Sequence, residues 1–446
     1  MVPTSPPVPL LLRWQGLLAD RPAGLAGPHL PRLAGWVLCA LMAGLPLVTR
    51  FGLSLLVLAA GLTWFLWALR TPPQRIGAID GWLLAVLAVA VLATGFSPVP
   101  AAAFKGLLKL GSYLAVYALM RKLLQAAPAW WDRIVAALMA GGLVTSVIGI
   151  RQLYADTDAL ARWSDANSLA EGTVRIYGTL GNPNLLGGYL LPLLPLAAVA
   201  LLRWRGAARR LFALTTLALG LVALVLTYSR GAWMGMVAAF AVLVLLLAMR
   251  RTLAWPPLWR RLLPVLLLVG GAAVLAVLVS QVEPLRVRVA SLLVGREDSS
   301  NNFRMTVWGA ALKMIRARPW LGIGPGNEAF NLIYPLYQAP KFNALSAYSI
   351  PLELLVEAGI PGLLAGLGLL QAAVRGGLAR WAERGPLVIP GLAAVAVFAG
   401  LGVQGLTDTI FFRPEVQLVA LFCLATVAAS AVPAPPARPP GAAASR

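Results

Sequence analysis

Long runs of apolar residues constrain this chain more than any other feature of its sequence. A helix needs about 20 mostly apolar residues to cross the hydrocarbon core of a bilayer, with a usable range of about 17 to 25. The runs are continuous and rich in Leu, Ala and Val, which favours helices over the alternating strands of a barrel. They predict an all-α polytopic membrane protein with about 12 transmembrane helices, at 33–49, 52–69, 79–95, 103–120, 134–150, 184–202, 211–228, 232–249, 262–282, 350–374, 386–405 and 415–432.

The composition agrees with this prediction. Of the 446 residues, 59% are hydrophobic and 12% are charged, which is about half the charged fraction of a soluble protein. A net charge of +21 can indicate a nucleic-acid binder. The basic residues, however, lie between the apolar runs and form no continuous stripe, so we expect no nucleic-acid partner. Cys39 and Cys423 lie inside apolar runs and predict no disulfide, and His29 is expected to be an ordinary exposed side chain.

The positions of the basic residues predict the topology. With the N-terminus in the cytoplasm, the cytoplasmic connections carry most of the arginines, whereas the short external connections carry only Arg50, Arg230 and Arg413. The alternation persists across all twelve runs and places both termini in the cytoplasm, with the chain in the inner (plasma) membrane. Nothing before the first run resembles a cleaved secretion signal, so we expect the first span to be retained.

Two connections are long, 151–183 and 283–349, and both fall on the external (periplasmic) side. Loops of this length are usually functional. The second contains a helix expected near 303–317, with an apolar face made by Met305, Trp308, Leu312 and Ile315. The expected organisation is a cytoplasmic N-terminal segment (1–32), transmembrane helices 1–9 (33–282) with the external loop 151–183, a large periplasmic loop (283–349), transmembrane helices 10–12 (350–432) and a disordered cytoplasmic tail (433–446).

Ionisable residues near the outer ends of two spans are functional candidates, because charge is costly inside a bilayer. Lys105 and Lys109 lie four residues apart on one span, and the deeper Lys109 favours an internal anion or carboxylate partner. Glu353 and Glu357 repeat the spacing on another span. The two lysines and the two acids can neutralise each other or form a polar site, and the sequence leaves both alternatives open.

Three arginines are expected to face the external compartment. Arg175 precedes the segment Gly181-Asn182-Pro183-Asn184, Arg230 lies in a very short turn, and Arg304 begins the loop helix. Together they can bind phosphate, carboxylate or bicarbonate. The alternative is pairing with acids such as Glu171, Glu297, Asp298 or Asp408. Asn182 and Pro183 are expected to start a helix as cap and first-turn residue.

The sequence contains no HExxH motif, Walker loop or Ser-His-Asp set, so we expect no metal and no cofactor. The run Gly322-Ile323-Gly324-Pro325-Gly326 resembles a phosphate loop only superficially. It lacks a preceding strand and a following Lys-Ser/Thr, so we interpret it as a turn.

Several segments resemble the O-antigen ligase and polymerase superfamily (Wzy_C/WaaL-like) of bacterial membrane proteins. The resemblance rests on 175–184, on Ser229-Arg230-Gly231-Ala232-Trp233, on the helix beginning at Arg304 with Leu321-Gly322-Ile323-Gly324 after it, and on 352–362. It implies that Arg175, Arg230 and Arg304 hold the pyrophosphate of a lipid-linked glycan. The ligases of this superfamily carry a His-Asn pair just before the segment that matches 352–362.

This chain has Tyr348 and Ser349 where the ligases have the His-Asn pair. Tyrosine, with an ordinary pKa near 10, is a poor general base at neutral pH, so Tyr348 has a doubtful catalytic role. The surrounding sequence is similar to a cyanobacterial branch described as bicarbonate (inorganic carbon) transporters of the IctB type. That branch implies an outward-facing anion site in which Arg175, Arg230, Arg304, Ser349, Lys109, Glu353 and Glu357 are the substrate-binding candidates.

Two functions are therefore expected. The first is bicarbonate transport with the outward-facing anion site. The alternative is metal-independent, inverting transfer of a glycan from undecaprenyl diphosphate, as by an O-antigen ligase or polymerase of polysaccharide biosynthesis. Membrane lipids are expected partners in both cases, with bicarbonate or the lipid-linked glycan as the ligand.

Overall fold

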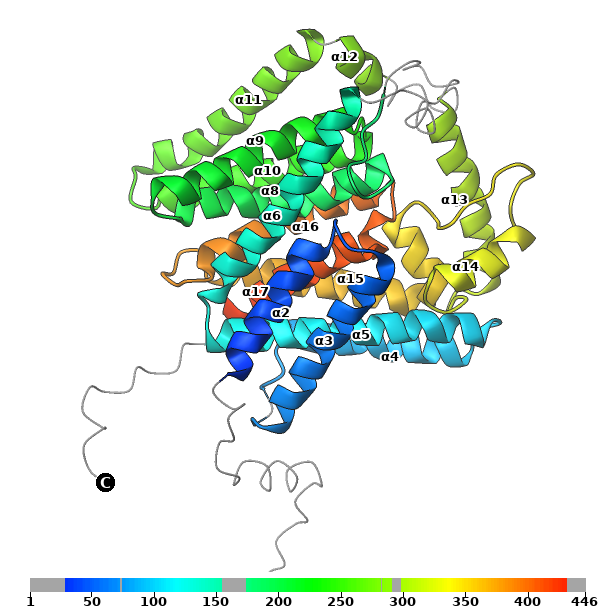
Figure 1. The fold of residues 1–446 in the computed structure, drawn as a ribbon. Helices are drawn as coiled ribbons and strands as arrows, with labels where there is room; N and C mark the ends of the chain where they lie inside the picture. The colour runs from blue at the N-terminus through cyan, green and yellow to red at the C-terminus, as the bar shows by residue number, and fades with distance from the viewer. Residues whose placement is uncertain (1–28, 73, 155–173, 282, 291–297, 431–446) are drawn as a thin grey trace, which may run out of the picture.

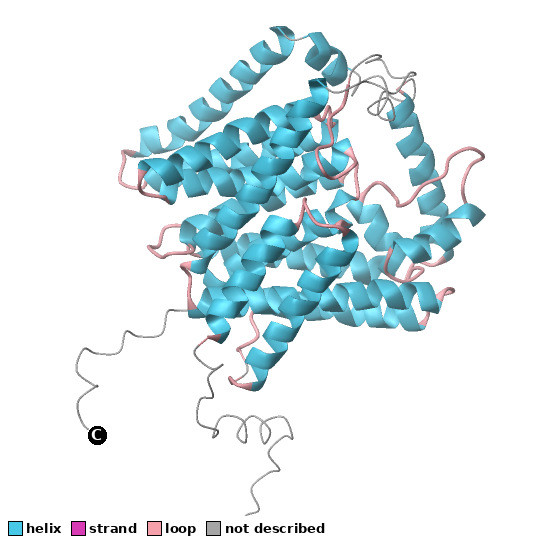
Figure 2. Ribbon diagram, in the orientation of Figure 1, coloured by secondary structure: helices cyan, strands magenta, loops and turns pink. Residues whose placement is uncertain are grey.

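The computed structural model describes residues 29–72, 74–154, 174–281, 283–290 and 298–430. These residues form helices joined by turns, and there is no strand among them (Figure 2). The all-α prediction is therefore confirmed for the described part of the chain. The first 28 residues, most of the loop 151–183 and the C-terminal tail lie outside the described residues.

Each of the twelve apolar runs coincides with a helix (Figure 1). Within the described residues, nine of these helices are long and apolar enough to cross a membrane. They are α3 (Arg50–Leu69), α4 (Ala78–Gly95), α6 (Trp130–Arg151, continued by a short turn to Tyr154), α8 (Pro183–Arg203), α9 (Ala207–Leu226), α10 (Arg230–Arg251), α11 (Pro257–Gln281), α15 (Ile350–Ala379) and α16 (Val388–Gly405).

Three further helices occupy the remaining runs and stay predicted spans. α2 (Leu30–Gly44) and α17 (Pro414–Ser430) are apolar but shorter. α5 (Pro100–Ala126) is long enough, but it carries Lys105, Lys109, Arg121 and Lys122. The expected number of about 12 spans is thus compatible with the helices but is not established by them.

Local sequence accounts for several helix starts. The Asn182 side chain accepts hydrogen bonds from the Asn184 and Leu185 backbone N–H groups at 2.8 and 3.2 Å, which confirms the predicted cap. Pro183 occupies the first helical position, where its missing N–H costs nothing. Asp80 accepts the Gly77 N–H at 2.6 Å at the start of α4.

The centre of the bundle is formed by α8 and α16, the most deeply buried of the candidate spans. Small residues allow this packing. A Cβ at Gly400 of α16 would lie 2.6 Å from the Gly235 carbonyl oxygen of α10, so these two helices approach backbone to backbone. Close contact through small residues is a common way for membrane helices to associate.

Polar contacts divide the connections into two sets that agree with the predicted topology. On the expected cytoplasmic side, Arg121 pairs with Asp80 at 3.1 Å and Arg203 pairs with Asp132 at 3.3 Å. On the expected external side, Lys105 pairs with Glu328 at 2.6 Å. Each contact joins segments predicted to lie on the same face. The orientation of these faces relative to the cell stays a prediction.

The loop expected to be external, called the external loop below, contains α13 (Ser299–Ala317) and α14 (Asn327–Ile333), preceded by the short α12 (Glu283–Ala290). α13 begins four residues before the predicted start, with Asp298 as its cap. The apolar face predicted for α13 only partly matches the face that is buried. Val307, Ala311 and Met314 are buried, whereas Met305 and Leu312 are 39% and 46% exposed. The buried residues of α13 belong to one hydrophobic cluster with Val356 of α15.

α15 is broken near its outer end. Gly359 has φ +64° and ψ −162°, which interrupts the helix between Ile350 and Ala379. The loop after α13 packs against the break: the N–H groups of Ile323 and Gly324 donate to the Val356 and Glu357 carbonyl oxygens, both at 2.9 Å. The Gly322–Gly326 run is thus a turn docked on a membrane helix, in agreement with its interpretation as a turn.

Candidate functional site

Arg230 forms a buried ion pair with Asp298. Its Nη2 lies 2.8 Å from the Asp298 Oδ1, and the two side chains are 6% and 0% exposed. Asp298 Oδ1 also accepts the Asn301 N–H at 3.0 Å, so the same carboxylate caps α13. Of the two expected roles for Arg230, pairing with an acid is the one that the structure contains.

Arg304 lies nearby on α13. Its Nη1 donates to Ser300 Oγ at 2.9 Å, while its buried Nε has no hydrogen-bond acceptor among the described residues. Burial lowers the pKa of Arg304, Asp408 raises it, and the positive charge of Arg230 lowers it further. Arg304 is therefore a largely buried cation with unused donor capacity, next to a second arginine. Such a group is suited to bind an anion.

Arg175 lies eight residues before α8 and donates hydrogen bonds to the end of α9 and to the first turn of α8. Its Nε donates to the Thr227 carbonyl oxygen at 2.9 Å, and its Nη2 donates to Asn184 Oδ1 at 2.8 Å. Thr227 lies three residues before Arg230 in the turn between α9 and α10. Arg175 therefore braces the turn that carries Arg230.

Tyr348 and Ser349 end the external loop at the start of α15. Tyr348 has φ +49°, a left-handed conformation that is uncommon for residues other than glycine. Its ring packs edge-on against Phe303 of α13 with centroids 5.3 Å apart, and its carbonyl oxygen accepts the Trp308 indole N–H. Burial and the nearby Asp408 raise the pKa of Tyr348. Ser349 is buried and occupies the cap position of α15.

From the sequence, Asp408 was expected only as a possible ion-pair partner of an arginine. It lies in the turn after α16, is 6% exposed, and accepts the Thr409 N–H at 2.7 Å. Burial raises its pKa, and the charge of Arg304 lowers it. The carboxylate thus lies within the electrostatic reach of both Arg304 and Tyr348. No sequence motif marks it, because its neighbours come from distant segments.

The expected lysine–glutamate set does not pair within itself. Lys105 binds Glu328 instead, and Lys109 donates to the Phe412 carbonyl oxygen at 2.9 Å. The Glu353 carboxylate accepts the Ala347 N–H at 2.5 Å, and the Glu357 carboxylate accepts the Gly326 N–H at 2.8 Å. The two acids therefore anchor the ends of the external loop to α15, and Lys109 remains beside Glu357 without a direct ion pair.

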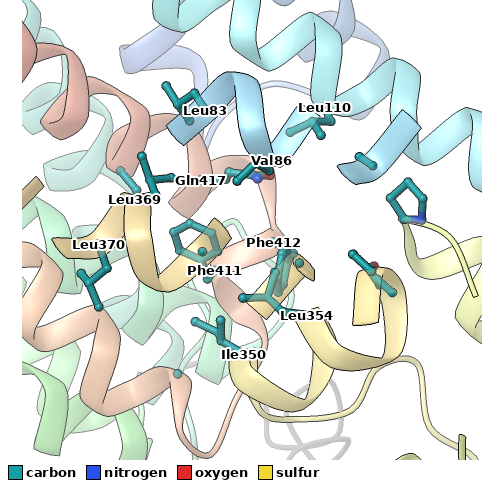
Figure 3. A pocket seen from close by; sticks show the side chains of 18 of the residues that line it. Leu83, Val86, Leu110, Ile350, Leu354, Leu369, Leu370, Phe411, Phe412 and Gln417 are labelled. Carbon is teal, nitrogen blue, oxygen red and sulfur yellow. The ribbon is translucent and has the colours of Figure 1, made fainter. Parts of the chain in front are cut away.

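A deep apolar groove of about 400 Å³ lies between α4, α5, α15, α16 and α17. Figure 3 shows Leu83, Leu110, Leu354 and Phe412 around the open space. Lys109, Glu357 and Asn327 line its outer end, and Leu83 and Ala373 line it far toward the other face. The groove was not predicted, because its lining residues come from five helices that are far apart in the sequence.

The groove and the arginine group are neighbours, separated by the first turns of α15. Ile350, Leu354 and Glu357 of that segment face the groove. Ser349 and Glu353, on the same segment, belong to the turn that carries Tyr348, since Glu353 binds Ala347. The turn after α16 completes the arrangement, because Phe412 lines the groove and Asp408 lies within reach of Arg304.

Within the described ranges, no three His, Cys, Asp or Glu side chains gather in a way that could hold a metal ion. The polar groups of the site are arginines, carboxylates and hydroxyls. Their chemistry is the binding of a large or small anion and, through Asp408, the acceptance of a proton.

Comparison with known families identifies one match. Residues 215–367 match the O-antigen ligase family (Wzy_C). The match covers α10, the external helices and the first half of α15, and so it includes Arg230, Arg304 and Tyr348. It supports an integral membrane protein of the O-antigen ligase-like superfamily. No curated protein matches the chain. The narrower resemblance to the bicarbonate-transporter branch receives no support from this match.

Proposed function

We propose that this protein binds a lipid-linked glycan diphosphate at the outer face of the membrane and transfers the glycan to an acceptor hydroxyl. The observation that carries the proposal is the proximity of two features: an apolar groove within the helical bundle, and a buried arginine with an unused Nε donor on the other side of the first turns of α15. A ligand with a long apolar chain and an anionic head needs both.

The length of the groove favours a polyprenyl chain over an ordinary acyl chain. Its lining includes α15 residues on both sides of the break at Gly359, and the part after the break, from Gly362 to Ala373, alone spans about 17 Å at 1.5 Å per residue. One leaflet of the hydrocarbon core is only about 15 Å thick. A chain that fills the groove must therefore reach beyond one leaflet, as a long isoprenoid can.

The diphosphate is assigned to the neighbourhood of Arg304. Its buried Nε has no acceptor among the described residues, so a phosphate oxygen would supply one. The helix starts at Arg230 and Ile350 add partial positive charge on the same side. Lys109, at the mouth of the groove, is placed to contact the same head group. Arg230 and Arg175 are assigned supporting roles, because both already hold protein partners.

The proposed transfer is a displacement at the anomeric carbon. The acceptor oxygen bonds to this carbon while the bond from the carbon to the diphosphate oxygen breaks. The electron pair leaves with the diphosphate, whose charge the arginines stabilise, and the hydroxyl proton passes to Asp408. Burial raises the pKa of both Asp408 and Tyr348. That shift moves a carboxylate toward useful basicity at neutral pH and moves a phenol away from it.

Bicarbonate transport is the second candidate, and one observation favours it. The position of the ligases' histidine is occupied by Tyr348, so the group that activates the acceptor in those enzymes is missing here. Bicarbonate could bind the same arginine and hydroxyl groups. The apolar groove, however, would then have no role in the function, which is why we rank this candidate second.

The deciding experiment measures binding of undecaprenyl diphosphate to the full-length protein in nanodiscs. Arg304→Gln is expected to weaken binding by about 10- to 100-fold, since hydrogen bonds to charged groups contribute about 1.5–3 kcal/mol. Arg316→Gln, on the exposed side of the same helix, is the matched control and should leave affinity unchanged. Equal affinity for undecaprenol, which lacks the diphosphate, would refute the assigned head-group site.

A second experiment separates transfer from transport. Asp408→Asn should preserve diphosphate binding and abolish glycan transfer in membrane vesicles. If bicarbonate flux into liposomes exceeds that of empty vesicles and is lost in Arg304→Gln, transport replaces transfer as the function of this site.

A further inference from the structure

A cluster of arginines gathers at the ends of three consecutive helices, on the face opposite the proposed site. Arg205 precedes α9, Arg209 and Arg210 lie in its first turn, Arg251 ends α10, and Arg260 and Arg261 lie in the first turns of α11. The connections between α8 and α9 and between α10 and α11 lie at the same side of the molecule in Figure 1. We call these six residues the α9–α11 arginine patch.

The patch is not balanced by acids of its own region. No aspartate or glutamate occurs between Glu171 and Glu283 in the sequence. Elsewhere on this face some arginines pair with acids, as in the Arg203–Asp132 and Arg380–Glu383 pairs. Within the patch, Arg210 Nε donates to the Trp204 carbonyl oxygen at 2.9 Å. All six arginines are exposed.

Membrane topology alone does not explain why most of these arginines lie at the starts of helices. A positive charge in the first turn of a helix is disfavoured by the helix dipole, whereas one at the end of a helix is favoured. Arg251 occupies the favourable end of α10, but Arg209, Arg210, Arg260 and Arg261 occupy unfavourable starts. An anion at the two helix starts would make these positions favourable, because it would bind both the arginines and the free N–H groups.

The surface beside the patch is apolar. α11 has the highest hydropathy of the candidate spans, and almost none of it is buried. Its Leu and Val side chains are exposed along its length, and α9 also leaves much of its surface uncovered. Trp255 and Trp259 are exposed next to the arginines, at the level where aromatic residues meet lipid head groups. The patch therefore combines sites for phosphate with surfaces for acyl chains.

We propose that the α9–α11 arginine patch is a binding site for an anionic phospholipid, whose phosphates contact Arg209, Arg210, Arg260 and Arg261 and whose acyl chains lie along α9 and α11. The site is independent of the proposed glycan site. Its occupant would also supply the packing that α11, which contacts mainly α10, lacks within the chain.

The test uses the purified full-length protein and measures, by native mass spectrometry, the retention of cardiolipin, phosphatidylglycerol and phosphatidylcholine. We expect cardiolipin and phosphatidylglycerol to be retained and phosphatidylcholine to be lost. The variant with Gln at 209, 210, 260 and 261 should weaken cardiolipin binding by at least about 100-fold, because each arginine near an anionic membrane contributes about fivefold.

The matched control replaces Arg32, Arg70, Arg375 and Arg384 with Gln, which removes four exposed arginines from the same expected face. Equal loss of cardiolipin in both variants would overturn the proposal, because the binding would then reflect net charge alone. Retention of soluble glycerophosphate as well as cardiolipin would overturn the assignment to a lipid. A thermal melt with and without cardiolipin gives a second readout, and the patch variant should lose the lipid-induced rise in Tm that the control keeps.

Discussion

Arg230 and Asp298, which are 68 residues apart in the chain, form a buried ion pair. The distance between Nη2 and Oδ1 is 2.8 Å. Arg230 is the first residue of α10, and Asp298 is the cap of α13. The pair therefore fastens the external helix to the membrane bundle at the point where both helices begin. Arg304, one turn into α13, is positioned by this attachment.

Breaking the pair should be costly. Asp298→Ala leaves Arg230 buried without its carboxylate, and removing one partner of a buried pair typically costs about 3–5 kcal/mol. The measurement is the midpoint of thermal unfolding of the purified protein. Glu328→Gln serves as the control, because its partner Lys105 is exposed and such pairs contribute only about 0–1 kcal/mol. Similar midpoints for the two variants would contradict the structural role of the buried pair.

Arg304→Met should raise the thermal stability of the ligand-free protein and abolish binding of the diphosphate. The substitution removes a buried donor without an acceptor, and an unsatisfied buried polar group costs about 1–3 kcal/mol. We expect the ligand-free protein to unfold at a higher temperature, while the increase in Tm caused by undecaprenyl diphosphate disappears. A lower Tm in the ligand-free protein would mean that Arg304 stabilises the fold instead.

Tyr348→His tests whether the scaffold retains the capacity for transfer. Histidine is enriched at positive φ relative to most residues, so the backbone at φ +49° should accept it. We expect increased glycan transfer to an acceptor in membrane vesicles, because an imidazole is a competent base near neutral pH. Tyr228→His is the matched control, since Tyr228 has φ +50° and also precedes the serine that caps a helix. Equal gains in both variants would argue against a specific role for residue 348.

Alanine substitutions at two glycines of α5 are expected to have opposite effects on the structure. A Cβ at Gly106 would lie 2.0 Å from the Pro325 carbonyl oxygen, so Gly106→Ala must displace the external loop. At Gly111 nothing lies within 4 Å, and alanine there should stabilise the helix by up to about 1 kcal/mol. Limited proteolysis should cleave the loop 319–327 faster in Gly106→Ala and no faster in Gly111→Ala. Unchanged cleavage in the first variant would show that α5 does not hold the loop.

The sequence was informative where a local pattern determines the structure. The apolar runs predicted where the helices lie, and Asn182 with Pro183 predicted one helix start in detail. Arg230 and Asp298 were recognised as possible partners, but their pairing depends on the fold and could not be chosen in advance. The apolar face expected for α13 was wrong at Met305 and Leu312, because the buried face is rotated around the helix and is formed by Val307, Ala311 and Met314.

The groove and Asp408 could not be predicted, for different reasons. The groove is lined by residues of five helices that are far apart in the sequence, so no single segment indicates the space between them. Asp408 gains its properties from Arg304 and from burial, neither of which is visible in its neighbours along the chain. The sequence left open whether the two lysines and the two glutamates pair with each other, and in the structure the carboxylates instead accept backbone N–H groups of the external loop.

The break at Gly359 also has a consequence for biogenesis. The Val356 and Glu357 carbonyl oxygens bind Ile323 and Gly324 instead of their own helix. An unpaired carbonyl in a lipid environment costs several kcal/mol. In the predicted topology, in which this loop is external, α15 therefore reaches its final conformation only after the loop has been exported and has folded back, and export of the loop and insertion of the helix form one cooperative assembly step.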